Sequence, residues 1–564
     1  MQDSKGDQDR LWFDLLLIIL LGIIIGVLGA FAANGFVIGA KTLFELIPVS
    51  PEQNWWQNFS VHWLVLVIAA GVILALKRLN GIARWHGPAD TILSAQVPKE
   101  PFQTRVGMLS TLAAFTSASA GASVGQYGPV VHFGASVASF IRTMIPTRIK
   151  PEVYLAAGVA AAISAGFNAP IAGVIFASEA ILRHFSVRAL APLAVASVSA
   201  AAITNLLFKR GAPYDIAPLD FSMHEVIPLL LAMALLSAAI AILFMSNLLK
   251  LVSWTGKQNN EPLTIFLAAS MMAVIGTIVP EVFGLGTATV NLFFSNHFEL
   301  TYLLIILGAK FVASILCLGM GLFGGVFSPA IFLGACSGTV VGVIAVMLGY
   351  PVSVVPLMTT VGMACVASSV VGAPIAIVVI VFELTQSYQY AVAAIFSVAI
   401  CSLISTRTYC YSYFDRQLLL RGFDLRHGRE NLILGKVKVA DLAISPVKGL
   451  SPADRCEDIV TSLCDTNNTE AYIVDEHNSL LGVVTLTNAL RSSGLTAREV
   501  IDTDPSILVV DQSLKQAMEV ARKFVGEAIP VVSSDNKLLG SMSEGDILGA
   551  VLTLQEEMKA DERN

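Results

Sequence analysis

Two short segments that contain glycine and proline have residue types suited to binding an anion. The first is GQYGP at residues 125–129, and the second is GVFSP at residues 325–329, so the two lie 200 residues apart. Glycine lets the backbone approach a ligand closely, and proline is favoured in the first turn of a helix. Each segment therefore predicts a helix N-terminus, where free amides and the helix dipole attract an anion without a cationic side chain.

A second matched pair of segments indicates an internal duplication. APIA at residues 169–172 is followed by Glu179, and APIA at residues 373–376 is followed by Glu383. In both copies the glutamate follows the proline by nine residues. Two matched pairs in the same order predict a duplicated membrane unit, in which broken helices from both halves meet near the midplane and form the site.

The composition indicates that membrane helices position these segments. Of the 564 residues, 55% are hydrophobic and 13% are charged, and the mean hydropathy is +0.72, whereas a soluble protein carries about a quarter charged residues. Apolar segments recur from Trp12 to about Ile404 and suit lipid-embedded helices of about 20 residues each. This composition argues against a soluble enzyme, a disordered or fibrous chain and a nucleic-acid binder with a basic face.

Some apolar segments are too short or too rich in glycine to be simple spans, notably residues 117–128 and 319–329. Such breaks are tolerated at membrane depth only where protein covers the backbone or where it lines a cavity, so they predict the place of the site. Polar loops are expected at residues 209–213 and 256–262. The first apolar run predicts an uncleaved membrane helix. The seven cysteines show no disulfide or metal-ligand spacing, so reduced thiols are expected.

After Arg407 the composition becomes charged and mixed, as in a soluble domain. Two copies of one pattern follow, VADLAISP with IVDEHNSLLGVVTLTNAL, and AREVIDTDP with IPVVSSDNKLLGSMSEGDIL. Each copy predicts a short helix, a strand that ends near an acidic turn, a second strand, and a helix opened by an Asn or Asp cap. A repeat of this kind in the tail of a membrane protein suggests a regulatory module.

The motifs resemble those of a known family, the CLC chloride channels and proton-coupled chloride transporters. GQYGPVVHFGA is similar to the family's GxEGP segment, GGVFSPAIFLGA to its GxFxP segment, and GFNAPIAGVIFASE to the stretch that follows GxEGP. HGPADTI lies where the family has a GSGIPE-like motif, and the tail repeats resemble CBS domains. The resemblance implies an all-α polytopic membrane domain with an inverted internal repeat and broken helices, followed by an α/β CBS pair in the cytoplasm.

The resemblance also implies a homodimer with one anion pathway in each subunit. The amides of Val326 and Phe327 would hold a central anion, and those around Tyr127 and Gly128 an outer one. The full set of anion-binding or pore residues that the resemblance indicates is His86, Gly87, Gly125, Gln126, Tyr127, Gly128, Pro129, Gly325, Val326, Phe327, Ser328, Pro329, Tyr413 and Phe414.

The chain departs from the family at both positions that carry protons in the exchangers. The external gating glutamate falls on Tyr127, whose phenol, with an ordinary pKa of about 10, stays neutral and can only block or hydrogen-bond. The internal proton-transfer glutamate falls on Ala180. We therefore predict no tight coupling of anion movement to protons. The neighbouring Glu179 has its counterpart in Glu383, which favours a structural role for this pair at helix ends.

Two further departures concern the central site. The serine that coordinates the anion falls on His86, which either donates to the anion and attracts it when protonated, or is satisfied by backbone at a helix start. The family's pore tyrosine falls on Phe414, or on Tyr413 if the alignment slips by one residue. If Phe414 is correct, the inner gate loses a hydroxyl and binds chloride less specifically. His132 is expected to be a packing or vestibule residue rather than a proton carrier.

In the tail, TLTN and SEGD resemble the CBS pattern in which a hydroxyl faces phosphate and an aspartate meets ribose. One interpretation is adenine nucleotide binding at Thr485, Asn488, Ser543 and Asp546, and the other is a purely structural dimerising pair. No other cofactor and no metal are expected.

The leading functional hypothesis is a channel for chloride or another small anion, or an anion transporter uncoupled from protons, regulated by its CBS domains. The alternative is a proton-coupled exchanger with a non-standard relay through His86, Tyr127 or His132. A cation channel would need acidic or oxygen-rich groups along its pore, which the long uncharged stretches do not offer. Neither an enzyme nor a nucleic-acid partner is expected.

The predicted boundaries place a cytoplasmic N-terminus at residues 1–10 and a membrane domain at 11–414, with repeats at about 11–210 and 225–414. A linker is expected at 415–435, and CBS domains at 436–495 and 496–556. The expected location is a bacterial inner membrane, crossed many times, with the CBS pair in the cytoplasm and a second copy of the chain as partner.

Overall fold

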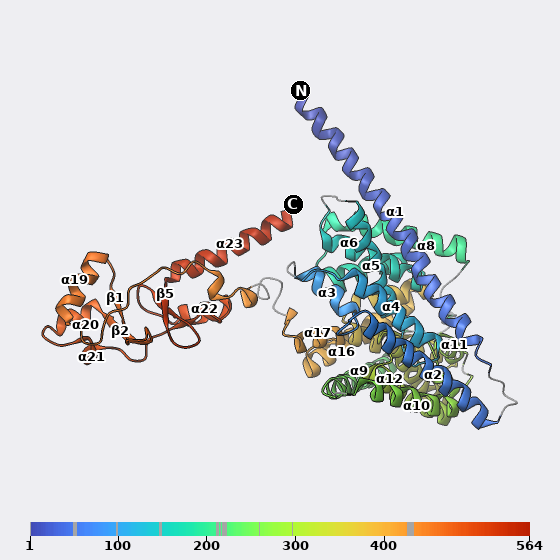
Figure 1. The fold of residues 1–564 in the computed structure, drawn as a ribbon. Coiled ribbons are helices and arrows are strands. Elements are labelled where there is room, and N and C mark those ends of the chain that lie inside the picture. Colours follow the sequence, from blue (N-terminus) through green and yellow to red (C-terminus); the bar gives the residue numbers. More distant parts are fainter. Residues whose placement is uncertain are drawn as a thin grey trace. The chain divides into compact units, whose positions relative to one another are not determined.

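In the computed structural model, two compact units divide the chain at Gly422 and Phe423. The structure describes residues 2–48, 54–97, 100–145, 149–209, 214, 216, 223–258, 260–295, 297–425 and 434–563. The first unit is helical and runs from blue to gold in Figure 1, and the second is the smaller orange and red unit. The predicted polar loop at residues 209–213 lies mostly outside the described residues.

The first half of the membrane unit consists of helices joined by short connections. Its elements are α1 (Gln2–Glu45), α2 (Trp55–Leu79), α3 (Pro88–Gln96), α4 (Thr104–Ser119), α5 (Tyr127–Met144), α6 (Pro151–Phe167), α7 (Pro170–Phe176), the π-helical turn η1 (Ala177–Leu182) and α8 (Val187–Phe208). The helix α1 already begins at Gln2, so the predicted N-terminal segment 1–10 is largely part of this first helix.

The second half repeats this order of helices. Its elements are η2 (Met223–Val226), α9 (Ile227–Thr255), α10 (Glu261–Ile278), η3 (Pro280–Val282), α11 (Thr287–Phe294), α12 (Leu300–Met320), α13 (Phe327–Met347), α14 (Val354–Val371), α15 (Pro374–Thr385), α16 (Tyr388–Tyr409) and α17 (Tyr413–Leu420). The run from α3 to α8 therefore has its counterpart in the run from α11 to α16, which confirms the predicted duplication.

Within the described residues, nine helices are long and apolar enough to cross a membrane. They include α13 and α14, and every residue of the apolar part of α14 is buried inside the protein. A helix that is apolar all round and buried packs against other helices on every side. The protein is thus an integral membrane protein with several spans, as the composition predicts.

Both predicted breaks are present at equivalent places. The helix α4 ends at Ser119 and α5 begins at Tyr127, while α12 ends at Met320 and α13 begins at Phe327. Gly121 and Gly321 follow the ends of α4 and α12 with φ of +88° and +117°, a conformation that glycine adopts at no steric cost. These turns lead into GQYGP (residues 125–129) and GVFSP (residues 325–329), which we call the two GxxxP segments.

The second unit contains two small sheets with flanking helices. The first copy of the repeat forms η5 (Val439–Asp441), α19 (Cys456–Thr466), β1 (Glu470–Val474), β2 (Leu480–Thr485), α20 (Leu486–Arg491) and α21 (Ala497–Val500). The second copy forms β3 (Leu508–Val509), α22 (Leu514–Ala521), β4 (Ile529–Val532), β5 (Leu538–Met542) and α23 (Glu544–Arg563). Strands β1 and β2 pair antiparallel, and β3 pairs parallel with β4, which pairs antiparallel with β5.

Two predicted details of the tail, the start of the linker and the helix caps, differ from the structure. The linker does not begin at residue 415, because α17 runs to Leu420 and the first unit ends at Gly422. The predicted limit at residues 495 and 496 falls just before α21, and segments cross between the two cores, because Ala497 packs in the core of the first copy and Val439 in that of the second. The helices after β2 and β5 are capped by the hydroxyls of Thr485 and Ser543 rather than by Asn or Asp.

Candidate anion-binding site

The two GxxxP segments meet through a pair of backbone hydrogen bonds. Gly125 N donates to Gly325 O and Gly325 N donates to Gly125 O, each at 2.8 Å, with the two strands antiparallel. A Cβ on Gly125 would lie 2.6 Å from Gly325 O, so no side chain fits there. Because the exchange is reciprocal, the two halves are related by a local two-fold axis, as in inverted repeats.

A third helix begins at the same point. A Cβ on Gly128, at the start of α5, would lie 3.0 Å from Gly325 Cα and 3.7 Å from Pro88 Cγ. Pro88 is the first residue of α3 and follows the N-cap Gly87. The N-termini of α3, α5 and α13 therefore converge, and each carries roughly half a positive charge from its helix dipole.

Several buried backbone amides at this convergence have no partner in the described part of the chain. Among the described residues, the structure shows no hydrogen-bond partner for the amides of Gly128, Val326 and Phe327. The amide of Gln126 is different, because it donates to Ser328 Oγ at 3.1 Å. Unpaired amides at helix N-termini bind anions, so the structure brings together the residues that the two GxxxP segments predicted.

The side chain of Tyr127 belongs to an aromatic cluster beside this site. Its ring is 98% buried and stacks on Phe167, with centroids 3.9 Å apart and an interplanar angle of 11°. The ring of Phe327, the first residue of α13, lies 5.4 Å from that of Tyr127. A Cβ on Gly166 would approach the Tyr127 ring to 3.1 Å, so α6 has no side chain at this contact. Tyr127 thus packs against the residue at the start of the opposite broken helix.

A small apolar cavity adjoins this aromatic cluster. Its volume is about 20 Å³, which is about the space of one water molecule. Its walls include Phe167, Phe327, Ile331 and Ile377, and one hydroxyl, that of Thr360, which already donates to a carbonyl in its own helix. A water needs two or more polar partners, so the lining of this cavity does not favour a bound water.

His86 precedes α3 and is half-buried. Its backbone amide donates to Ser110 Oγ at 2.9 Å, which fixes the main chain at this position. Its ring lies 6.2 Å from that of His132, which is 99% buried and shares a hydrogen bond of 2.7 Å with Thr91 Oγ1. In the described part of the chain, His132 Nε2 has no hydrogen-bond partner. The two histidines form a polar cluster beside the start of α3.

Asp90, in the first turn of α3, ties this helix to α17. Its carboxylate accepts from Gly87 N at 2.9 Å, from Arg84 at 2.6 Å and from Arg421 at 2.9 Å. The helix α3 is too short to span a membrane. Burial by itself raises the pKa of Asp90, but the hydrogen bond from Arg84 and the charge of Arg421 lower it to about 2. Asp90 is therefore an ionised anchor.

The aromatic pair at the start of α17 is buried. Tyr413 is the first residue of the helix and its hydroxyl accepts from Gln417 Nε2 at 3.0 Å, while the Phe414 ring lies 5.9 Å from that of Tyr413. Asp415, in the first turn, pairs with Arg183, which follows η1. These ion pairs link α17 to α3 and η1.

Glu179 and Glu383 cap helices of opposite repeats. The Glu179 carboxylate accepts from the amides of Ile375 and Ala376 at the start of α15, at 3.1 and 2.7 Å. The Glu383 carboxylate accepts from the amides of Ile171 and Ala172 at the start of α7, at 2.9 and 2.7 Å. This exchange confirms the predicted structural role at helix ends.

Ala180 lies next to Glu179 in the π-helical turn η1 and is buried. At this position the side chain is a methyl group, which holds no proton. The carbonyls of the following two residues, Ile181 and Leu182, each accept from Gln96 Nε2 at 2.8 Å, which fixes η1 to the end of α3.

The sequence interpretation missed Asp90, Arg421 and Ser110. The pattern HGPAD contains a signal for Asp90, because proline in the first position and an acidic residue in the third are typical of a helix start. Arg421 lies 331 residues away, and no local pattern indicates that contact.

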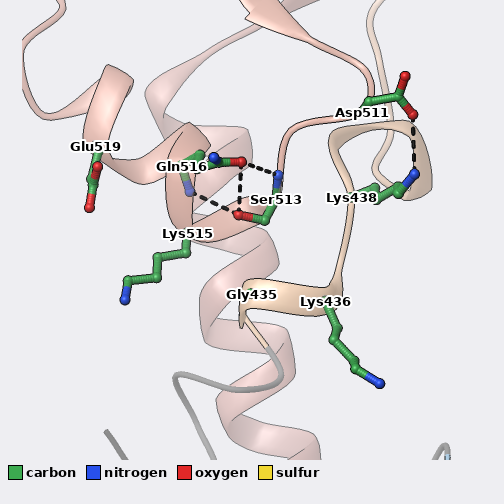
Figure 2. Close-up of a pocket in the computed structure, with 8 residues that line it drawn as sticks. All are labelled: Gly435, Lys436, Lys438, Asp511, Ser513, Lys515, Gln516 and Glu519. Carbon is green, nitrogen blue, oxygen red and sulfur yellow. Dashed lines mark hydrogen bonds and ion pairs between the residues drawn. The ribbon is translucent and has the colours of Figure 1, made fainter. Parts of the chain in front are cut away.

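On the CBS unit, the predicted nucleotide residues serve as helix caps. Thr485 Oγ1 accepts from Asn488 N, and Ser543 Oγ accepts from Asp546 N while Asp546 accepts from Ser543 N. They are not among the residues around a surface pocket of about 650 Å³ next to α22, shown in Figure 2. In this pocket Lys438 pairs with Asp511 and Ser513 bonds with Gln516. Adenine nucleotide binding stays a prediction.

The fold and the site define a class, that of polytopic membrane transport proteins built from inverted repeats of broken helices. A sequence model described as "Voltage gated chloride channel" matches residues 65–406, and one described as "CBS domain" matches residues 497–553. The chain belongs to the voltage gated chloride channel family and carries a C-terminal CBS domain.

Relatives agree with this assignment. A putative ClcB-like chloride channel protein of Ralstonia nicotianae is 28% identical over 355 residues, covering 61% of this chain and 81% of its own. Chloride channel protein CLC-f of Arabidopsis thaliana is 23% identical and aligns with 94% of this chain and 69% of its own. The solved structure of a slow cyanobacterial Cl⁻/H⁺ antiporter has a TM-score of 0.62, at 19% identity, and covers 73% of this chain and 99% of its own. At that identity the structural likeness concerns the fold.

Proposed function

We propose that the protein moves chloride or another small anion through the convergence of α3, α5 and α13, without coupling to protons. The observation that carries this proposal is the packing of Tyr127, a neutral side chain, at the position where the family has its gating carboxylate. Ala180 occupies the other proton-carrying position. Unpaired amides of Gly128, Val326 and Phe327 supply the anion site. Dipoles hold an ion weakly enough to let it leave, as conduction requires.

A flux measurement tests this proposal. The purified full chain is reconstituted into liposomes loaded with chloride, and anion efflux and external pH are recorded together. We expect anion efflux that is driven by the anion gradient, with no uphill movement of protons. Liposomes without protein give the background, and a proton ionophore shows that a pH change is detectable. Uphill proton movement driven by a chloride gradient would contradict the proposal.

The second candidate function is a proton-coupled anion exchanger. The polar cluster of His86, His132 and Thr91 favours it, because a buried histidine next to the site offers a protonatable group, while residues 127 and 180 carry no carboxylate. The antiporter named among the structural relatives is consistent with this candidate. Replacing His86 and His132 by glutamine, one at a time, separates the two functions, because loss of proton flux with retained anion flux occurs only in an exchanger.

We further propose that the chain forms a homodimer in a bacterial inner membrane, with the CBS unit in the cytoplasm as a regulatory module. Glu179 and Glu383 support a protein partner, because both carboxylates are only half-buried within one chain and polar groups are costly to expose to lipid. Exposed Ile171 and Ile375 beside them would pack in the same interface. Cross-linking of an Ile375→Cys variant in membranes tests the dimer. As the control, a cysteine at an exposed position on α2 should give no cross-linked product.

A further inference from the structure

Lys310 lies inside the membrane unit, near the middle of α12, and only 1% of the residue is exposed. Its ammonium donates to Val282 O at 3.0 Å and Gly284 O at 3.5 Å, and it lies 4.6 Å from the centre of the Phe332 ring. These hydrogen-bond partners are backbone carbonyls rather than a carboxylate. An ionisable side chain buried in a membrane protein is costly and marks a functional candidate.

The carbonyls that Lys310 binds belong to Val282, the last residue of η3, and to Gly284 in the turn that leads to α11. This turn contacts the break between α4 and α5. Gly284 N donates to Gly121 O at 2.9 Å. The intervening Phe283 ring would lie 3.2 Å from a Cβ on Gly121. Lys310 therefore fixes a turn that supports the beginning of the break in the first repeat.

One helical turn after Lys310, α12 makes a second contact with the same break. Ser314 Oγ and Ser123 Oγ share a hydrogen bond of 2.9 Å, and both residues are fully buried. Residues four positions apart lie on the same face of a helix, so one face of α12 supports the break at two points. Ser123 is two residues before Gly125, so this hydrogen bond lies next to the first GxxxP segment.

The equivalent position in the first repeat has a related role. Ser110 of α4 lies 200 residues before Lys310, and its hydroxyl accepts from the amide of His86, at the loop before α3. In both repeats, this helix position therefore contacts the loop before the preceding short helix, which is α3 in the first repeat and α11 in the second. In the second repeat the contact is made by a cation.

We propose that Lys310 and Ser314 are positioning residues for the anion site, through which α12 of the second repeat holds the Gly121–Gly125 turn of the first. This inference rests on the proposed anion transport. The turn sets the orientation of the amides at the start of α5, so loosening it changes which anions the site prefers as well as how fast they pass.

Two substitutions test this role. Lys310→Met removes the charge and the donor but keeps the length of the side chain, and Ser314→Ala removes one hydroxyl. We expect Lys310→Met to lower chloride flux by about tenfold and Ser314→Ala by about threefold, the range that follows from loss of one or two hydrogen bonds. Both should bring the nitrate-to-chloride permeability ratio closer to one, which a general loss of stability would not do. Lys310→Gln, which keeps a hydrogen-bond donor, should retain part of the selectivity that Lys310→Met loses.

The matched control is Thr339→Val. Thr339 and Thr359 also share a buried hydroxyl hydrogen bond, of 2.8 Å, but Thr339 lies roughly 18 Å along α13 from Phe327, at 1.5 Å per residue. Its permeability ratio should equal that of the unaltered protein. If Lys310→Met does not fold, Ser314→Ala decides alone, and unchanged selectivity in a folded Ser314→Ala variant would overturn the proposal.

Amide hydrogen exchange gives a readout that does not depend on transport. In detergent, peptides that cover residues 118–128 should exchange faster in Ser314→Ala than in the unaltered protein, while peptides of α14 do not change. Slow exchange throughout the break in both substituted proteins would also overturn the proposal. If exchange accelerates as expected but the unaltered protein moves no anion, the positioning role holds and the proposed transport function fails.

Discussion

The backbone amide of Gly125 donates to the carbonyl oxygen of Gly325, and the amide of Gly325 donates to the carbonyl oxygen of Gly125, each at 2.8 Å. This exchange joins two helix breaks that lie 200 residues apart, and it lets the N-termini of α5 and α13 face a common point. Neither glycine has room for a side chain. The centre of the site is therefore built from backbone atoms.

The first prediction concerns this exchange. Gly125→Ala places a Cβ 2.6 Å from Gly325 O and 2.9 Å from Ser328 N, so one of the breaks must shift. We expect anion flux to fall by about tenfold or more, since a shift of one ångström in a site can cost about a hundredfold. Gly71→Ala, in open space on α2, is the matched control in the liposome assay. Normal flux in a folded Gly125→Ala protein would contradict this expectation.

The second prediction concerns Tyr127, at the start of α5. Tyr127→Glu places a carboxylate, with an ordinary pKa of about 4.3, where a neutral ring now lies. Above that pKa the negative charge competes with the anion, and below it the protonated group does not. Flux through Tyr127→Glu should therefore rise as the pH falls from 7 to 4, whereas Tyr127→Gln should show no such rise. The same pH profile in the two variants would show that this position does not face the anion.

The third prediction concerns the exchanged caps. Glu179→Gln and Glu383→Gln each weaken two hydrogen bonds from helix amides, which should lower the free energy of unfolding by about 1 kcal/mol because the carboxylates are half-exposed. Thermal unfolding in detergent measures this effect. Glu45→Gln, which removes only an exposed pair with Lys41 at 3.7 Å, should leave the melting temperature unchanged. A strong effect of Glu179→Gln on proton movement, with unchanged stability, would instead assign a transport role.

The fourth prediction concerns Asp90 and pH. The pKa of Asp90 is about 2, below its ordinary value of 3.8, so its ionised form stabilises the folded state above pH 4 and this contribution is lost as the pH falls toward 2. Asp90→Asn should lower the melting temperature between pH 5 and 8 by a constant amount, equivalent to about 1–3 kcal/mol. The difference from the unaltered protein should shrink below pH 4. A difference that is the same at pH 3 and pH 7 would assign the effect to something other than charge.

The membrane unit was largely predictable from local patterns. Glycine and proline at residues 125–129 and 325–329 predict helix starts, and the matched glutamates predict a duplication. The pairing of Asp90 with Arg421 was not predictable, because its partners lie on α3 and beyond α17, with most of the chain between them. The contacts between the two copies in the tail were not predictable for a similar reason, since short segments such as residues 497–500 pack into the core formed by β1, β2 and α19.

The sequence by itself determined the membrane character, the duplication, the family resemblance and the presence of Tyr127 and Ala180 rather than carboxylates, because these depend on residue type and spacing along the chain. The tertiary structure decided that Gly125 and Gly325 bond to each other, that Tyr127 stacks on Phe167, and that Glu179 and Glu383 cap helices of opposite repeats. Such contacts join residues from about 40 to more than 200 positions apart. They depend on how helices pack in three dimensions, which no local pattern encodes.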